Sequence, residues 1–204
     1  MSQLILVRHG ESEWNLRGIW TGLTDIGLSE KGKEQARLVG EKLKDFPIDF
    51  AFTSILIRAK QTLSEIKSVL GIDVPTFEDK ALNERDYGIY TGKNKWEIKK
   101  EVGDERFQNI RRGWDVPIEN GESLKDVYNR VVPYFQTEIL PKLKEEKNVL
   151  IVAHGNSLRA LVKYLDNIAD ENIQNLEILF DQVYFYEINP LGKIVSRKIV
   201  SVGN

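Results

Sequence analysis

The only two histidines among the 204 residues occupy the same kind of position. His9 follows the apolar run Leu4–Val7 in LILVRHGESEWN, and His154 follows the apolar run Val149–Ala153 in NVLIVAHGNSLRAL. If these runs are neighbouring strands, both imidazoles meet at the carboxyl ends of the strands, where open α/β sheets bind ligands. A single histidine after a strand is more often an ordinary loop residue. Two such positions, with no other histidine in the chain, favour function.

Three arginines are expected beside the same strand ends. Arg8 ends the first apolar run, Arg58 lies one turn into a helix expected after a strand at Asp49–Thr53, and Arg85 lies in LNERDYG. A guanidinium group binds phosphate through paired hydrogen bonds, and the first turn of a helix adds backbone N–H donors. These features together predict a pocket for a phosphoryl group.

A histidine in such a pocket can act as a nucleophile and carry the phosphoryl group covalently. Nearby arginines disfavour the protonated imidazole and so keep it nucleophilic. The second histidine can bind the equatorial oxygens of the group in transfer. Glu84 in LNERDYG is the candidate proton donor and acceptor, although its spacing fits a surface glutamate equally well. No carboxylate cluster or His-x-x-x-His spacing indicates a metal site.

The elements that would position these groups alternate along the chain. Helices are expected to begin at Ser29, Ser54, Ser123 and Asn156, with Pro133 kinking the third and Pro141 near a break. The alternation predicts an α/β fold, a three-layer α/β/α sandwich with a mostly parallel central sheet, in a single domain of residues 1–204. Five strands are predicted, the last two forming a hairpin: Leu4–Val7, Asp49–Thr53, Val149–Ala153, Gln182–Ile188 and Ile194–Val200. Residues 79–121 are predicted to form long loops with short helices over the sheet edge.

The composition excludes several classes of protein. A formal net charge of −2 provides no global basic field for nucleic acid or membrane. The absence of cysteine excludes disulfides and thiolate metal sites. No apolar run has the length of a membrane span, and MSQLILVRHG lacks the pattern of a signal peptide. We therefore expect a cytoplasmic protein.

The order of the motifs resembles that of the cofactor-dependent phosphoglycerate mutases of the histidine phosphatase superfamily. RHG alone would indicate only the superfamily, whereas RHGESEWN followed by LNER and AHGNSLRALVKYLD indicates the mutase branch. The resemblance extends from about residue 3 to residue 188. It is carried by RHGESEWN, Thr21-Gly22, TSILIRAKQT, LNERDYG, GKNK, RRGWD, GESLKD and AHGNSLRALVKYLD.

The resemblance implies a role for each matching residue. His9 would be the phosphohistidine nucleophile, Glu84 the proton donor and acceptor, and His154 a transition-state stabiliser, with the transferred phosphoryl group held by Arg8 and Arg58. The substrate would be held by Ser12, Asn15, Thr21, Gly22, Arg85, Tyr87, Lys95, Arg111, Arg112, Gly155 and Asn156.

The implied reaction interconverts 2-phosphoglycerate and 3-phosphoglycerate in glycolysis and gluconeogenesis. The implied cofactor is 2,3-bisphosphoglycerate, as primer and intermediate, without a metal. The partners would be small phosphorylated molecules rather than nucleic acid or membrane. The oligomeric state stays open between monomer and dimer.

Four departures from the family pattern bear on the site. Asp86 stands where relatives carry a larger or aromatic residue, often His, so its carboxylate is expected to weaken anion binding unless it points away. The stretch from Arg112 to Gly121 is short, and segment 176–183 lacks a Pro-Thr-Gly turn. The sequence ends at Asn204, so a long C-terminal tail over the site is not expected.

Two other readings remain open. A phosphatase on the same scaffold would pass the phosphoryl group to water instead of an alcohol. Lys95 and the pair Arg111 and Arg112 favour the mutase, because a bisphosphate needs cations at its far end. A non-catalytic phosphate-binding module is disfavoured, because all five residues with implied catalytic roles are retained.

Overall fold

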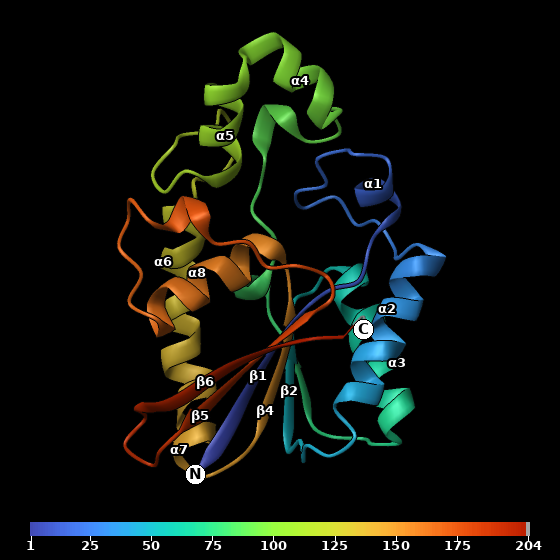
Figure 1. Cartoon of the computed structure of the whole chain (residues 1–204), viewed down its shortest axis with the longest axis vertical. Helices are drawn as coiled ribbons and strands as arrows, with labels where there is room; N and C mark the ends of the chain where they lie inside the picture. The colour runs from blue at the N-terminus through green and yellow to red at the C-terminus, as the bar shows by residue number, and fades with distance from the viewer. Residues whose placement is uncertain (203–204) are drawn as a thin grey trace.

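A six-stranded sheet forms the centre of the molecule, in the order β3-β2-β4-β1-β5-β6 (Figure 1). The computed structural model describes residues 1–202, so the expectation drawn from Asn204 lies outside the described residues. Strands β3, β2, β4 and β1 are parallel, whereas β5 and β6 are each antiparallel to their neighbour, as the predicted hairpin requires. The bounds are β1 Ser2–Arg8, β2 Phe50–Thr53, β3 Thr76–Glu78, β4 Val149–Ala153, β5 Gln182–Ile188 and β6 Ile194–Ser201.

The two strands that precede the histidines are direct neighbours. β1 pairs with β4 so that Arg8 lies opposite Ala153. His9 N then donates to Ala153 O at 2.9 Å. Each histidine is the first residue after its strand, so the register brings them side by side, as expected if the two runs are neighbouring strands.

Helices cover both faces of the sheet, which confirms the three-layer α/β/α sandwich (Figure 1). Alternate residues of β1 point to opposite faces: Ile5 and Val7 pack in one apolar cluster, Leu4 and Leu6 in the other. On the first face lie α2 (Glu30–Lys42) and α3 (Ile57–Leu70), and on the second α6 (Leu124–Tyr134), α7 (Leu140–Lys144) and α8 (Gly155–Leu165). Within residues 1–202, no helix is both long enough and apolar enough to cross a bilayer.

Two of the four predicted helix caps are confirmed and two are wrong. Ser29 and Ser123 accept hydrogen bonds from the first turns of α2 and α6, as expected. The predictions for Ser54 and Asn156 are wrong. α3 begins after Leu56 without a side-chain cap, because the Ser54 hydroxyl lies 2.6 Å from a His154 ring nitrogen. His154 itself is the N-cap of α8, so Asn156 lies inside the first turn of that helix.

The helix that carries Pro133 continues without interruption. Pro133 lies inside α6, and the next turn, η3 (Phe135–Ile139), is π-helical before α7 begins. Proline lacks an N–H and crowds the turn before it. Pro141, in the first turn of α7, therefore accounts for the irregular winding of the π-helical turn that precedes it.

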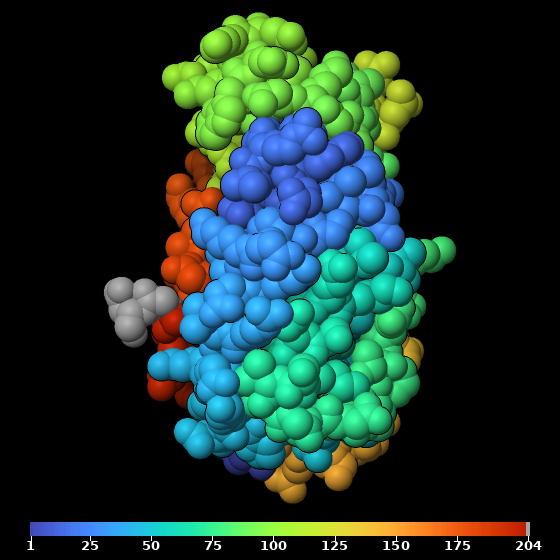
Figure 2. Space-filling model, turned by 90° about the vertical axis from the view of Figure 1, so that its right-hand side faces the viewer, coloured from blue at the N-terminus to red at the C-terminus, as the bar shows by residue number. Residues whose placement is uncertain are grey.

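Residues 88–112 project beyond the carboxyl ends of the strands, and we call them the cap (Figures 1 and 2). The expectation of loops and short helices holds, but the segment lies above the strand ends rather than over the sheet edge. Trp20 anchors the cap by packing against Phe107 and Tyr90 at ring-centroid distances of 6.1 and 5.1 Å. The short elements in and around it are α1 Glu13–Leu16, η1 Lys80–Leu82, η2 Gly88–Tyr90, α4 Lys95–Val102, α5 Asp104–Arg112 and η4 Ile173–Asn175.

Candidate active site

His9 is held in one tautomer at the end of β1. Its Nδ1 lies 2.6 Å from Gly10 O. A carbonyl oxygen only accepts, so Nδ1 donates and Nε2 keeps its free electron pair. Burial lowers the pKa of His9 well below its usual value, and the charges of Arg58 and Arg8 lower it further. The neutral, nucleophilic imidazole therefore prevails near pH 7.

The glycine after His9 is required by a close backbone contact. A Cβ at Gly10 would lie 2.2 Å from Gly32 O, a distance that no side chain tolerates. Gly10 N also donates to Thr62 Oγ1 at 3.0 Å. The loop thus passes tightly against α2 and α3, which fixes the backbone of His9.

His154 lies beside His9, with 4.9 Å between the ring centroids. Ser54 Oγ accepts from Leu56 N and lies 2.6 Å from His154 Nε2. When Ser54 donates its proton to Nε2, Nδ1 carries the hydrogen. This buried Nδ1 has no hydrogen-bond partner among residues 1–202. Burial, followed by the charge of Arg58, lowers the pKa of His154 well below its usual value, so it offers a neutral donor.

Two arginines flank the histidines, Arg58 buried and Arg8 partly buried. Arg58 is 1% exposed and donates to Gly22 O at 2.9 Å and Thr24 O at 3.0 Å. Arg8 donates to Ile178 O at 2.8 Å, and its buried Nε has no partner within the described chain. The two guanidinium groups create a strongly positive field around His9.

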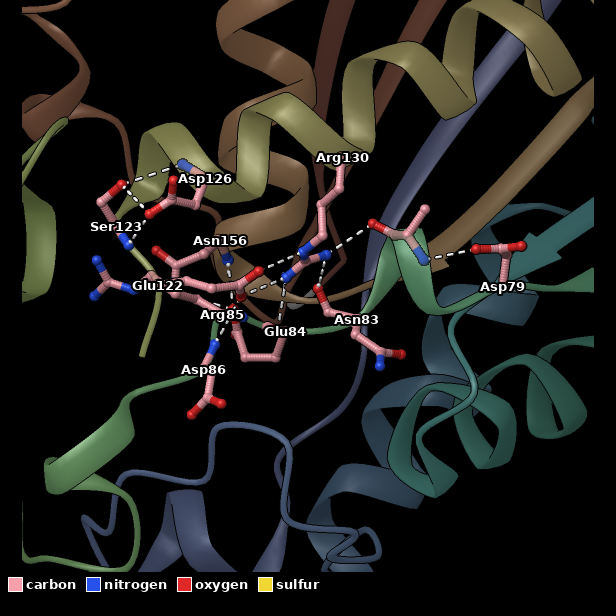
Figure 3. Close-up of polar contacts among 11 residues, drawn as sticks. Asp79, Asn83, Glu84, Arg85, Asp86, Glu122, Ser123, Asp126, Arg130 and Asn156 are labelled. Atoms are coloured by element: carbon pink, nitrogen blue, oxygen red, sulfur yellow. Dashed lines mark hydrogen bonds and ion pairs between the residues drawn. The ribbon is translucent and has the colours of Figure 1, made fainter. Parts of the chain in front are cut away.

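The Glu84 carboxylate lies near these positive charges, and one of its two oxygens accepts hydrogen bonds from the protein (Figure 3). Its Oε1 accepts from Arg85 N at 2.7 Å, and from Asn156 N and Nδ2 at 3.1 and 3.0 Å. Burial raises the pKa of Glu84, but the Arg85 N–H, the charge of Arg58 and the Asn156 amide together bring it below the usual value. Glu84 is therefore ionised and ready to accept a proton.

Two adjoining hollows form one cleft around these groups. The first reaches His9, and the second extends under the cap toward Arg111 and Arg112; both are lined by Arg8, Trp20, Glu84, Tyr87 and Lys95. Burial, with the charges of Arg111 and Arg8, lowers the pKa of Lys95 to about 8. The sequence-predicted residues that line the cleft are Arg8, His9, Asn15, Thr21, Gly22, Arg58, Glu84, Tyr87, Lys95, Arg111, Arg112, Gly155 and Asn156.

Ser12 and Arg85 do not line either hollow, so their part in holding the substrate stays a prediction. The Ser12 hydroxyl caps α1, and Ser12 is completely buried. The Arg85 guanidinium donates to Ile110 O and Arg111 O, so it supports the end of α5. The Asp86 side chain accepts from Gly88 N at 2.9 Å and points away from Glu84 (Figure 3).

Several residues of the cleft are not found by the sequence reasoning. Trp20 directly precedes Thr21-Gly22, and Arg159 lies inside AHGNSLRALVKYLD, but neither residue has a feature in the sequence that marks it as part of the cleft. Glu177 and Ile178 line the cleft from the segment before β5, whose departure from the family pattern hid them. Phe180 from the same segment lies 3.8 Å under the Arg8 guanidinium and 6.0 Å from the His9 ring.

The donor set of the cleft suits a polyanion. Arg8, Arg58, Lys95, Arg111, Arg112 and Arg159 face the two carboxylates of Glu84 and Glu177. The unpartnered Arg8 Nε is a buried donor of the kind that phosphate oxygens satisfy. His154, whose Nδ1 is also unpartnered, lines neither hollow but lies 4.9 Å from the His9 ring. Within residues 1–202, no group of three or more His, Asp or Glu side chains has the arrangement of a metal site.

Comparison with known proteins agrees with this geometry. Residues 4–197 match the model of the histidine phosphatase superfamily (branch 1). A relative from Chelativorans sp. (strain BNC1) is 48% identical over 97% of each chain, and one from Nitrobacter hamburgensis is 46% identical over 95% of each. Both carry the name 2,3-bisphosphoglycerate-dependent phosphoglycerate mutase.

A solved structure of a mycobacterial glucosyl-3-phosphoglycerate phosphatase, in complex with VO3, has the same fold. Its TM-score is 0.80 at 24% identity, and the match covers 98% of each chain. The chain therefore belongs to the histidine phosphatase superfamily, within the family of the 2,3-bisphosphoglycerate-dependent phosphoglycerate mutases.

Proposed function

We propose that this protein interconverts 2-phosphoglycerate and 3-phosphoglycerate through a phosphohistidine on His9. The observation that carries the proposal is the fixed tautomer of His9, whose free Nε2 lies in a cleft lined by Arg8, Arg58 and Glu84. The mutase names of the two relatives support the same reaction.

The first transfer forms a bond between His9 Nε2 and phosphorus and breaks the bond between phosphorus and the ester oxygen. Arg8 and Arg58 bind the phosphoryl oxygens, and the His154 Nδ1–H donates to the group as charge develops on it. In the reverse transfer, the substrate hydroxyl attacks the phosphohistidine while Glu84 takes the hydroxyl proton.

Glu84 also has to return that proton to a leaving oxygen. A bound phosphoryl group offsets the positive charges of Arg58 and Arg8, which hold the pKa of Glu84 down in the free protein. Phosphate binding therefore raises the pKa of Glu84 toward the range in which it protonates a leaving group.

The outer end of the cleft distinguishes a mutase from a phosphatase. A phosphoglycerate carries a carboxylate and the bisphosphate carries a second phosphate, and both need cations away from His9. Arg111 and Arg112 line only the hollow away from His9, and Lys95 lines both hollows; a simple transfer to water has no use for this group of cations.

The proposal includes 2,3-bisphosphoglycerate as the molecule that supplies the first phosphoryl group. We also propose that residues 1–204 act as one domain in the cytoplasm, on small phosphorylated molecules rather than nucleic acid. The oligomeric state, monomer or dimer, is left to sedimentation analysis.

A coupled assay of 3-phosphoglycerate conversion tests the function, with and without 2,3-bisphosphoglycerate and with phosphate release measured in parallel. We expect isomerisation that depends on 2,3-bisphosphoglycerate and exceeds phosphate release. The variant His9→Ala should fold normally and have no activity. Phosphate release faster than isomerisation in the wild type would show that the protein is a phosphatase.

A further inference from the structure

The loop that carries Glu84 has no regular secondary structure of its own. Residues 83–87 lie between η1 and η2 without helical or strand bonding. A proton donor and acceptor has to be held within a fraction of an ångström of its reacting position, and a shift of about 1 Å can cost 10²-fold in rate. Some other part of the molecule therefore has to fix this loop.

Arg130, on α6, supplies part of this restraint (Figure 3). Its Nη1 donates to Ala81 O at 2.8 Å and Asn83 O at 3.0 Å, and its Nη2 donates to Glu84 O at 3.0 Å. Nε and Nη2 also donate to the two carboxylate oxygens of Glu122 at 2.8 and 2.9 Å. All five N–H groups of the guanidinium are thus used, three of them on backbone carbonyls around Glu84.

Glu122 extends the restraint to the other side of Glu84. Its Oε2 accepts from Asp86 N at 2.9 Å, and its own N donates to Asp86 O at 2.9 Å. Arg130 and Glu122 together therefore hold the backbone on both sides of the catalytic carboxylate.

The restraint comes from a rigid part of the molecule. α6 begins at a reciprocal cap, in which Ser123 Oγ accepts from Asp126 N at 3.1 Å and Ser123 N donates to Asp126 Oδ2 at 2.9 Å. Its buried face packs in the same apolar cluster as α8. Because α8 carries Asn156, which binds the Glu84 carboxylate, one helix pair fixes both the backbone and the side chain of Glu84.

We propose that Arg130 is a positioning residue for Glu84, and that it sets the rate of proton transfer without touching the substrate. Arg130 approaches Glu84 from behind: its side chain is 23% exposed, and it is not among the residues that line the cleft. The inference rests on the proposed function, since it assigns Arg130 to the proton transfer of that reaction.

Arg130→Lys is the sharpest test, because lysine keeps the charge but has no planar fork to span three carbonyls and a carboxylate. We expect kcat to fall about 10-fold to 10²-fold while KM changes less than about twofold. We also expect the acid limb of the pH profile to move to higher pH, because a looser loop weakens the Arg85 N–H bond that helps hold the pKa of Glu84 down.

A double-mutant cycle with Glu84→Gln separates positioning from general stability. The readout is the single-turnover rate at which 2,3-bisphosphoglycerate phosphorylates His9. If Arg130 acts through Glu84, Arg130→Lys should slow this rate in the wild-type background and change it less than about twofold in the Glu84→Gln background. Equal losses in both backgrounds, or an unchanged rate in the wild-type background, would overturn the proposal.

The matched control is Arg37→Lys, which alters an exposed ion pair with Glu65 remote from the cleft. It should leave the phosphorylation rate unchanged. If Arg130→Lys does not fold, Glu122→Gln takes its place in the cycle; the same non-additive loss supports the proposal and an additive loss overturns it. A wild-type protein that phosphorylates His9 but does not isomerise phosphoglycerate would contradict the proposed function, while the cycle would still test Arg130.

Discussion

At the scale of single residues, the chemistry depends on which side-chain nitrogen or oxygen is hydrogen-bonded to the protein and which is left free. His9 Nδ1 is hydrogen-bonded to Gly10 O, and His154 Nε2 is hydrogen-bonded to Ser54. The free ring nitrogen is therefore Nε2 in His9 and Nδ1 in His154. Glu84 likewise has one oxygen occupied by three donors. In the proposed reaction, these neighbours decide which residue attacks, which donates and which exchanges a proton.

The pair Arg111 and Arg112 should separate the two candidate reactions. We expect Arg111→Ala with Arg112→Ala to lower kcat/KM for mutase activity at least about tenfold, since one charge-assisted hydrogen bond is worth roughly 1.5–3 kcal/mol. Alanine keeps the backbone carbonyls that accept from Arg85 and Arg159, so the fold should survive.

Hydrolysis of a small phosphomonoester without a second anion should change much less in this double variant. The exposed Arg106 on the same helix is the control, and Arg106→Ala should change neither rate. Equal losses in both assays would place the pair in the phosphoryl site or in the fold.

Lys95 predicts a basic limit to substrate binding. Its pKa is lowered to about 8 by burial and by the charges of Arg111 and Arg8. The ammonium form binds anions, so kcat/KM should fall as the pH rises above about 8. A bound anion raises the pKa of Lys95 again, so kcat at saturation should fall much less.

Measurement of both parameters from pH 6.5 to 9.5 tests this prediction. Lys95→Met should have a lower kcat/KM without the basic limb, whereas exposed Lys93→Met should keep the wild-type profile. A limb that persists in Lys95→Met would assign the titration to another group.

At the scale of elements, segment 176–181 is a wall held by the arginines it faces. Leu176 O accepts from Arg159 Nε at 3.0 Å, Ile178 O accepts from Arg8, and Glu177 forms an ion pair with Arg112. The carboxylate of Glu177 therefore competes with any anion that binds Arg112.

Glu177→Gln should lower KM for phosphoglycerate by a few fold with little change in kcat. The ion pair is partly exposed, and such pairs contribute about 0–1 kcal/mol, so the effect is modest and should shrink with added salt. Glu105→Gln on the exposed side of α5 is the control. An increase in KM would instead show that Glu177 orients Arg112 for the substrate.

The sequence predicts the strands whose apolar residues are buried. It does not predict an exposed strand, or a side chain whose partner lies far away in the sequence. β1 and β4 are continuous apolar runs because both their faces are covered, whereas their pairing with each other is shown by the structure alone. β3 is short and exposed at the sheet edge, so TFE carries no strand pattern. Ser54 resembles a helix cap, but a tertiary contact with His154 takes its hydroxyl.

The candidate site divides in the same way. Motif residues such as His9 and Glu84 are found because their chemistry is visible in the sequence. Arg159 and Arg130 are missed because their partners are mainly backbone carbonyls of distant segments, and such partners are set by the fold alone.

At the scale of the whole molecule, the charge distribution is uneven. The net charge is only −2, yet the cleft gathers six basic side chains against two carboxylates. The attraction for anions is therefore local, and acidic groups elsewhere keep the total near zero.

Both histidines of the chain should make stability depend on pH. Burial and the neighbouring arginines lower the pKa of His9 and His154 well below 6.5, whereas the unfolded chain takes up these protons near pH 6.5. The unfolded state thus binds more protons, and the free energy of unfolding should decrease as the pH falls below about 6.5. The slope approaches about 1.4 kcal/mol per pH unit for each histidine.

Urea unfolding at pH 7.5, 6.5 and 5.5 measures this slope. His9→Asn should remove about half of it, and the double variant with His154→Asn should remove nearly all. Glu84 does not interfere, because its lowered pKa adds stability that is lost only below its unfolded value, near pH 4. A flat dependence in the wild type would show that the folded protein also protonates its histidines.

The basic groups that face one another across the cleft have a consequence for the free protein. Arg8 and Arg58 belong to the sandwich, whereas Lys95, Arg111 and Arg112 belong to the cap, so like charges meet at the boundary between the two parts of the molecule. A dianion between them acts as a counterion bridge, and at a concentration of 100 Kd it adds about 2.7 kcal/mol to the folded state. Inorganic phosphate or sulfate should thus raise the melting temperature and slow amide exchange in α4 and α5, so that the choice of buffer sets the stability measured for the free protein.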